Sequence, residues 1–192
     1  MSLFTDELAR LDAYALEQVQ ALHWAPLSAL FVLASAWWVK GLLFVGIGVL
    51  RDSRSRPLLP LAAISGVLAF GLASAATSLV KDLVDRPRPA LADPTFETLV
   101  ATPESASFPS GHASTAFAAA VAVAVFCPRR LRWPLLGLAT LVALSRVYLG
   151  VHYWLDVLVG SALGIGAGLL AARLVRRGAI ALRPSASAEG DA

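Results

Sequence analysis

The sequence is short of charged residues and almost lacks cysteine. Only 15% of its 192 residues are charged and 57% are hydrophobic, whereas a soluble domain carries about 25% charged residues. Too few polar residues remain to cover a water-exposed surface, which excludes an ordinary soluble domain and favours a membrane protein folded as one helical unit. The single cysteine, Cys127, excludes an intramolecular disulfide and cannot hold a metal cluster by itself.

A basic face suited to nucleic acid is also missing. The net charge is +3, but the arginines gather at the ends of apolar segments, which fits membrane topology better than a DNA-binding surface. Cysteine pairs and clusters of histidine and carboxylate with metal-ligand spacing do not occur, so the sequence favours chemistry without a metal or other cofactor. We therefore expect a membrane bilayer as the environment and no nucleic-acid partner.

Long apolar segments fill most of the remaining sequence. Residues 5–22 alternate apolar and polar positions at helical spacing and predict an amphipathic surface helix, and residues 1–22 lack the features of a signal peptide. Five segments follow, each near the roughly 20 residues that cross a bilayer: Leu27–Leu50, Leu58–Val80, Ser110–Cys127, Leu131–Val147 and His152–Ala172.

This pattern predicts an all-α, polytopic membrane bundle with about five to six transmembrane helices. We expect an N-terminal surface helix in residues 1–25, a transmembrane catalytic domain in 26–177 and a flexible tail in 178–192. The arginines after the first, third and fifth segments fall on one side, which the positive-inside rule makes cytoplasmic. The loop 81–109 and the turn 146–152 then face the outer side of a multi-pass cell-membrane protein.

A ladder of small residues in the fifth segment allows close helix packing. Gly160, Gly164 and Gly168 are four residues apart and share one helix face. We expect this face to pack within the bundle, with a homodimer as the alternative.

Polar residues collect at the outward helix ends. Lys81 and Arg88 follow the second segment and face the same way if the helix continues, although snorkelling at the interface is the alternative. Ser110 and Gly111 precede an apolar helix, whose first N–H groups are suited to bind an anion. Arg146 ends the fourth segment and adds a further cation.

Two histidines complete this group. His152 and Asp156 are four residues apart and lie on one helical face, where the carboxylate can orient the imidazole, and a carboxylate near the membrane is costly and usually functional. His112 follows the Ser110–Gly111 pair. Cations and backbone N–H groups can bind a phosphoryl group, and one histidine can attack phosphorus while the other protonates the leaving oxygen.

These residues resemble the three-part signature of the type 2 phosphatidic acid phosphatase superfamily. The motifs, in order, are Lys81-(six residues)-Arg88-Pro89, Pro109-Ser110-Gly111-His112 and Ser145-Arg146-(five residues)-His152-(three residues)-Asp156. The resemblance implies the helical core that this family shares with haloperoxidases. It implies His152 as the nucleophile that forms a phosphohistidine, Asp156 as its orienting carboxylate and His112 as the general acid. It further implies a phosphate site that needs no metal, formed by Lys81, Arg88, Ser110, Gly111 and Arg146.

The resemblance also limits the substrate to a membrane lipid phosphate. Small bacterial members imply undecaprenyl pyrophosphate, phosphatidic acid or phosphatidylglycerol phosphate. The loop 90–107 is expected to shape the entrance to the site. Many bacterial members have six spans, whereas this sequence shows five and a surface helix. A phosphotransferase acting on a lipid or sugar acceptor, and a non-catalytic lipid-phosphate binder or transporter, remain as alternatives.

Overall fold

The computed structural model describes residues 6–36, 41–55 and 60–181, and every regular element in these ranges is a helix. This confirms the all-α prediction. The helices are α1 (Asp6–Gln20), α2 (Ala25–Ala34), α3 (Leu42–Ser55), α4 (Leu61–Val84), α5 (Pro89–Ala92), α6 (Gly111–Ala124), α7 (Arg129–Tyr148) and α8 (Trp154–Ala181).

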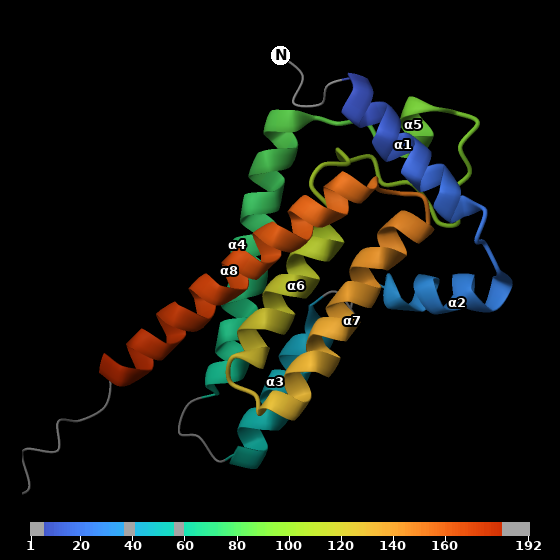
Figure 1. Cartoon of the computed structure of the whole chain (residues 1–192). Coiled ribbons are helices and arrows are strands. Elements are labelled where there is room, and N and C mark those ends of the chain that lie inside the picture. The colour runs from blue at the N-terminus through green and yellow to red at the C-terminus, as the bar shows by residue number, and fades with distance from the viewer. Residues whose placement is uncertain (1–5, 37–40, 56–59, 182–192) are drawn as a thin grey trace, which may run out of the picture.

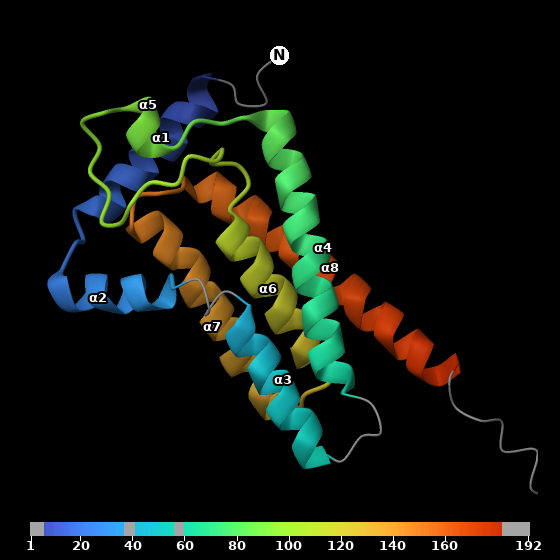
Figure 2. The same cartoon turned by 180° about the vertical axis from the view of Figure 1, so that it is seen from behind.

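Helix α6 forms the centre of the bundle, with α4, α7 and α8 packed around it (Figures 1 and 2). Most of its buried residues are alanines, whose small side chains let neighbouring backbones come close. The glycine ladder of α8 packs on α6. A Cβ at Gly160 would lie 2.6 Å from the Ser110 carbonyl oxygen, and Cβ atoms at Gly164 and Gly168 would collide with the α6 backbone. The predicted packing of this face within the bundle is confirmed.

The prediction of one helix over Leu27–Leu50 is wrong. This segment contains two helices, because α2 ends at Ala34 and α3 begins at Leu42, and α2 lies across the bundle while α3 runs along it (Figures 1 and 2). Gly41 fits closely against the ring of Phe70, where a Cβ would collide. An apolar run indicates that residues avoid water but not how the helix axis is directed, so hydropathy does not reveal that α2 and α3 point in different directions.

The other predicted segments correspond to single helices with shifted ends. Two described helices have the length and hydropathy of membrane spans, α8 and the segment Leu61–Ala92 that contains α4. Helix α8 continues to Ala181, so the predicted boundary at residue 177 falls inside a helix, and the rest of the predicted tail, 182–192, lies outside the described residues.

Helix α1 packs against one end of the bundle. Leu16 is fully buried with Val147, Tyr153 and Val157, and the indole N–H of Trp154 donates to the Ala15 carbonyl at 3.3 Å. The sequence correctly predicted a helix here, and it contacts α7 and α8 at the end of the bundle where α5 lies (Figure 1). Its expected place on the membrane surface stays a prediction. The expected division at residue 25 does not separate two independently packed parts.

Candidate active site

A pocket of about 340 Å³ opens at this end of the bundle. The predicted residues that line it come from α4, the loop before α5, the start of α6, the end of α7 and the α7–α8 turn: Lys81, Arg88, Gly111, His112, Arg146 and His152. Ser110 and Asp156 are fully buried behind this lining. The fold thus brings the three sequence motifs to one place.

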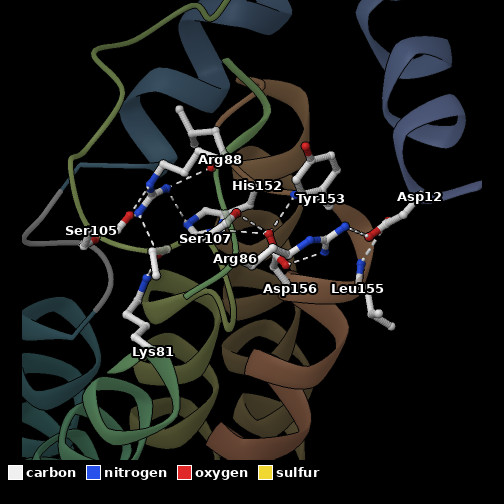
Figure 3. Close-up of polar contacts among 12 residues, drawn as sticks. Asp12, Lys81, Arg86, Arg88, Ser105, Ser107, His152, Tyr153, Leu155 and Asp156 are labelled. Carbon is white, nitrogen blue, oxygen red and sulfur yellow. Dashed lines mark hydrogen bonds and ion pairs between the residues drawn. The ribbon is translucent and has the colours of Figure 1, made fainter. Parts of the chain in front are cut away.

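His152 and Asp156 form the buried centre of the site (Figure 3). His152 lies in the turn before α8, and its Nδ1 is 3.5 Å from Asp156 Oδ2. The same carboxylate oxygen accepts hydrogen bonds from the Ser107 hydroxyl and, at 3.0 Å, from the Tyr153 N–H. Asp156 is therefore held from several directions with one oxygen on the Nδ1 side of the imidazole.

Arg88 fixes the protonation of the other ring nitrogen. Its Nη1 is 3.1 Å from His152 Nε2 and also donates to the Val151 carbonyl at 2.8 Å. Because a guanidinium can only donate, Nε2 must be unprotonated and the ring proton must lie on Nδ1. Burial, the largest effect, lowers the pKa of His152 to about 4 despite the raising influence of Asp156. At neutral pH the imidazole is uncharged, with its Nε2 lone pair at the pocket.

Lys81 and Arg88 converge by a different route from the one predicted. Helix α4 ends at Val84, and Asp85 follows in the left-handed region with a φ of 44°. The chain then turns, so the two cations meet on one loop: Lys81 Nζ donates to the Ala106 carbonyl, and Arg88 Nη2 lies 3.4 Å from the same oxygen. The helix does not continue to Arg88, as the prediction required, yet Lys81 and Arg88 line the same pocket.

Main-chain hydrogen bonds hold together the loops and turns that carry the motifs. The Ser110 N–H donates to the Asp156 carbonyl at 2.9 Å, the Ser107 N–H to the Arg86 carbonyl at 2.8 Å and the Val151 N–H to the Arg146 carbonyl at 3.2 Å. The Ser110 N–H is thus occupied and cannot bind an anion, contrary to the expectation for this backbone group. Its hydroxyl is buried and has no hydrogen-bond partner among the described residues, so the side chain remains a candidate ligand.

Arg146 enters the pocket from the last turn of α7. It is 4% exposed, and its Nη1 donates to the Ser35 hydroxyl just after α2. The Nε atom is buried and has no hydrogen-bond partner in the described part of the chain. A buried guanidinium with unused donors is suited to an anionic ligand.

Sequence reasoning missed three residues around Asp156. Arg86 donates to Asp156 Oδ1 at 2.7 Å and forms an ion pair with Asp12 of α1 at 2.9 Å, and its guanidinium stacks 3.9 Å from the Tyr153 ring centre (Figure 3). Ser107 donates to the other oxygen of Asp156. The Arg86-Pro87-Arg88-Pro89 repeat was visible in the sequence, but nothing local indicated that Asp12 would reach it.

The loop 90–107 contributes to the pocket wall. Pro103 and Ser105 line the pocket, and the Ser105 carbonyl accepts from Arg88 Nε at 2.8 Å. Its acidic residues Asp93, Glu97 and Glu104 are not among the lining residues. The expectation that this loop shapes the entrance is supported by Pro103 and Ser105 rather than by its charges.

The donor set of the pocket is cationic. Among the described residues no three of the types His, Cys, Asp and Glu lie close enough together to hold a metal ion. Lys81, Arg88 and Arg146 present positive charge to the pocket instead. Such a set suits an anion with several oxygens, for example a phosphoryl group.

Comparison with known proteins finds relatives that are named as phosphatases. The chain is 43% identical over 108 residues to the decaprenylphosphoryl-5-phosphoribose phosphatase of Mycobacterium tuberculosis, covering 56% of this chain and 57% of that protein. It is 31% identical over 140 residues to the undecaprenyl-diphosphatase BcrC of Bacillus subtilis, covering 73% of this chain and 69% of that one. The chain thus spans little more than half of the mycobacterial relative.

A solved structure shares the fold. The transmembrane PAP2-type phosphatidylglycerolphosphate phosphatase of Bacillus subtilis superposes with a TM-score of 0.72 at 26% identity, covering 94% of this chain and 90% of that one. Residues 62–179, which contain all three motifs, match the PAP2 superfamily. Because this segment makes up more than half of the 192 residues and carries the convergent site, the protein belongs to the PAP2 superfamily.

Proposed function

We propose that the protein is a metal-independent lipid phosphatase that works through a phosphohistidine at His152. The orientation of this imidazole carries the proposal: Nε2 is unprotonated at the pocket, and Nδ1 faces the buried carboxylate of Asp156. A histidine held in this way is a nucleophile rather than a simple phosphate ligand. Such a pair has no evident use in a protein that only binds or transports a lipid phosphate.

In the first step, Nε2 forms a bond to phosphorus while the bond from phosphorus to the leaving oxygen breaks. Arg88 Nη1, which donates to Nε2, moves to a phosphoryl oxygen as the substrate binds. The ring becomes positively charged, and Asp156 stabilises that charge through Nδ1–H. The 3.5 Å separation of these two groups is long, but catalytic hydrogen bonds commonly tighten in the substrate complex.

His112 serves as the acid and then as the base. It lies in the first turn of α6 and lines the same pocket as His152. Its proton goes to the leaving oxygen in the first step. In the second step it accepts a proton from water, whose oxygen attacks phosphorus and breaks the P–N bond, so that phosphate leaves and Nε2 regains its lone pair.

The cationic side chains take the part that a metal plays in other phosphatases. Lys81, Arg88 and Arg146 surround the phosphoryl oxygens, with the Gly111 backbone and the Ser110 hydroxyl completing the site. Charge that develops on these oxygens in the transition state is stabilised by donors already in place, which is an effective form of catalysis.

Arg86 and Ser107 position the carboxylate. Arg86 binds one oxygen of Asp156 and Ser107 the other, so the carboxylate cannot rotate away from His152. Asp12 of α1 holds Arg86 from the opposite side, which makes the N-terminal helix part of the catalytic support. Outer partners of this kind orient a reacting group without touching substrate.

A polyprenyl phosphate or pyrophosphate is the substrate class that we favour. The two relatives named above carry names of enzymes that act on decaprenyl- and undecaprenyl-linked phosphates. The pocket volume of about 340 Å³ suits a phosphate group and its first attached atoms, which leaves the lipid chain in the membrane. The arginines at the opposite end of the bundle favour a multi-pass orientation with the site on the outer side.

Phosphate release by the purified protein in EDTA tests the proposal. We expect turnover of undecaprenyl pyrophosphate, compared with phosphatidic acid and phosphatidylglycerol phosphate, and an acid-labile, base-stable phosphoenzyme. His152→Ala should abolish both signals. His23→Ala is the matched control, because His23 Nε2 forms a hydrogen bond with the Tyr148 carbonyl at 2.9 Å and His23 does not line the pocket.

Each alternative gives a different result. Full activity in His152→Ala refutes the nucleophile, and loss of activity in EDTA that added metal restores refutes metal independence. Lipid-phosphate binding without turnover across the panel supports a binder or transporter. A phosphorylated alcohol formed in preference to free phosphate supports a phosphotransferase, because water and an alcohol compete for the same phosphohistidine.

A further inference from the structure

A second, larger cavity lies at the opposite end of the bundle. It has a volume of about 810 Å³ and is bounded by the end of α3, the α6–α7 turn and the last turns of α8. In Figure 1 this is the lower end of the bundle, away from α1 and α5. The proposed phosphatase chemistry makes no use of it.

Five arginines line this cavity, which we call the arginine hollow: Arg51, Arg54, Arg130, Arg132 and Arg176. They come from three different helices, and no carboxylate is among the described lining residues. The neighbouring Asp52 is buried and accepts hydrogen bonds from the N–H groups of Ala62 and Ala63 at 3.0 and 3.1 Å, at the start of α4, and its other oxygen pairs with Arg51 at 3.5 Å. The other four arginines have no carboxylate partner among the described residues. These cations repel one another, and a bound anion relieves that repulsion.

A purely structural role accounts for part of this cluster. The Nε atoms of Arg51 and Arg132 donate to the carbonyls of Phe126 and Cys127 at 2.8 and 3.1 Å. These bonds satisfy two backbone carbonyl groups just after the end of α6. Arg54 and Arg130 have no hydrogen-bond or ion-pair partner in the described part of the chain. The guanidinium carbon of Arg176 lies 5.7 Å from the Phe126 ring centre. The positive-inside rule explains arginines at this end, but not their arrangement around one cavity.

Two apolar grooves adjoin the arginine hollow. One, of about 260 Å³, lies between α6 and α8 and includes Leu169 and Ala172, while the other, of about 130 Å³, lies between α6 and α7 and includes Val121 and Leu136. Val125 borders all three spaces. Arg173 and Arg176 also line the first groove and Arg132 the second, so both grooves adjoin the arginines.

We propose that the arginine hollow binds the headgroup phosphate of an anionic diacyl phospholipid, with the first carbons of its two acyl chains in the adjoining grooves. A free phosphate would use the arginines but not the grooves, and a neutral lipid would use the grooves but not the surplus of positive charge. Arginine binds phosphate oxygens in pairs, and basic pockets between membrane helices are suited to anionic headgroups. The bound lipid connects α3, α7 and α8 at the end remote from the catalytic pocket.

Binding of defined lipids to the full-length protein tests this site. The probes are phosphatidylglycerol, phosphatidylcholine with the same acyl chains, and glycerol 3-phosphate, measured by native mass spectrometry and by the shift of the thermal midpoint. The test variant is Arg130→Gln/Arg176→Gln. The matched control is Arg129→Gln/Arg177→Gln, which removes the same charge from the same two helices at residues that do not line the hollow.

We expect the test variant to bind phosphatidylglycerol at least roughly tenfold more weakly than the wild type, and the control to bind it nearly as well as the wild type. A single gel-filtration peak and an unchanged helical spectrum establish that both variants fold. Equal losses in the two variants would show diffuse surface attraction and overturn the proposal. So would equal binding of phosphatidylcholine, or displacement of phosphatidylglycerol by equimolar glycerol 3-phosphate.

Discussion

Arg86 connects carboxylates from α1 and α8, and its replacement by methionine separates a catalytic from a purely structural contribution. Arg86 and Asp12 are each 7% exposed and Asp156 is fully buried, so removal of the cation leaves two carboxylates without their main partner. Breaking a buried pair from one side costs about 3–5 kcal/mol. We expect Arg86→Met to lower the free energy of unfolding by this amount and kcat by roughly 10- to 100-fold, as for other outer-shell orienting residues.

The double variant Asp12→Leu/Arg86→Met distinguishes the two effects. Replacing both members of a buried pair by apolar residues often restores stability. The Leu155 N–H, which donates to Asp12 at 3.2 Å, loses its acceptor, so the recovery is partial. Asp156 still lacks Arg86, and kcat should therefore remain low. Phosphate release and denaturant unfolding in the same detergent measure both quantities, and recovery of kcat in the double variant would refute a positioning role for Arg86.

Three further predictions follow from other contacts. Ser107→Ala should lower kcat about tenfold with little change in KM. Ser105→Ala loses one hydrogen bond from Arg88 Nη2, while the Ser105 carbonyl still accepts from Arg88 Nε, so it should retain most of its activity; equal effects contradict the assignment. Gly160→Ala should reduce both the thermal midpoint and phosphate release because its Cβ meets the opposing backbone, whereas Gly166→Ala, with nothing within 4 Å, should be neutral or slightly stabilising. The pKa of His152 is about 4 in the folded protein and about 6.5 in the unfolded chain, so between these pH values only the unfolded chain binds the extra proton. The neutral His152 therefore lowers the free energy of unfolding as the pH drops from about 6.5 to about 4. His152→Gln should lose less stability over this pH range than the wild type, and parallel curves of stability against pH would contradict this.

Interactions within one helical turn were predictable from the sequence. The spacing of His152 and Asp156 correctly indicated that they lie together, but not for the predicted reason, because His152 precedes α8 and does not lie on a face of that helix. Within α8, positions four residues apart do share a face, because helix geometry fixes them. The glycine ladder was predictable for the same reason. The all-helical fold followed from the apolar segments, which require internal hydrogen bonding in a membrane.

Features that depend on direction or on distant contacts could not be predicted in the same way. The segment Leu27–Leu50 would have the same hydropathy as one helix or as two, so hydropathy did not predict that α2 and α3 are separate. Lys81 and Arg88 meet because the chain turns after α4 at Asp85, not because a helix continues. Asp12 reaches Arg86 only once α1 has packed on α7 and α8, and no local pattern specifies that packing.

The main-chain hydrogen bonds around the site have a consequence for how such a protein can diverge. The bonds from Ser110 to Asp156, from Ser107 to Arg86 and from Val151 to Arg146 involve only backbone atoms, which every amino acid except proline provides. Mutation can therefore exchange reactive side chains while the frame around the pocket persists. A descendant that lost its histidines would keep the folded frame and the cationic pocket, so a new binding role could arise without loss of the fold.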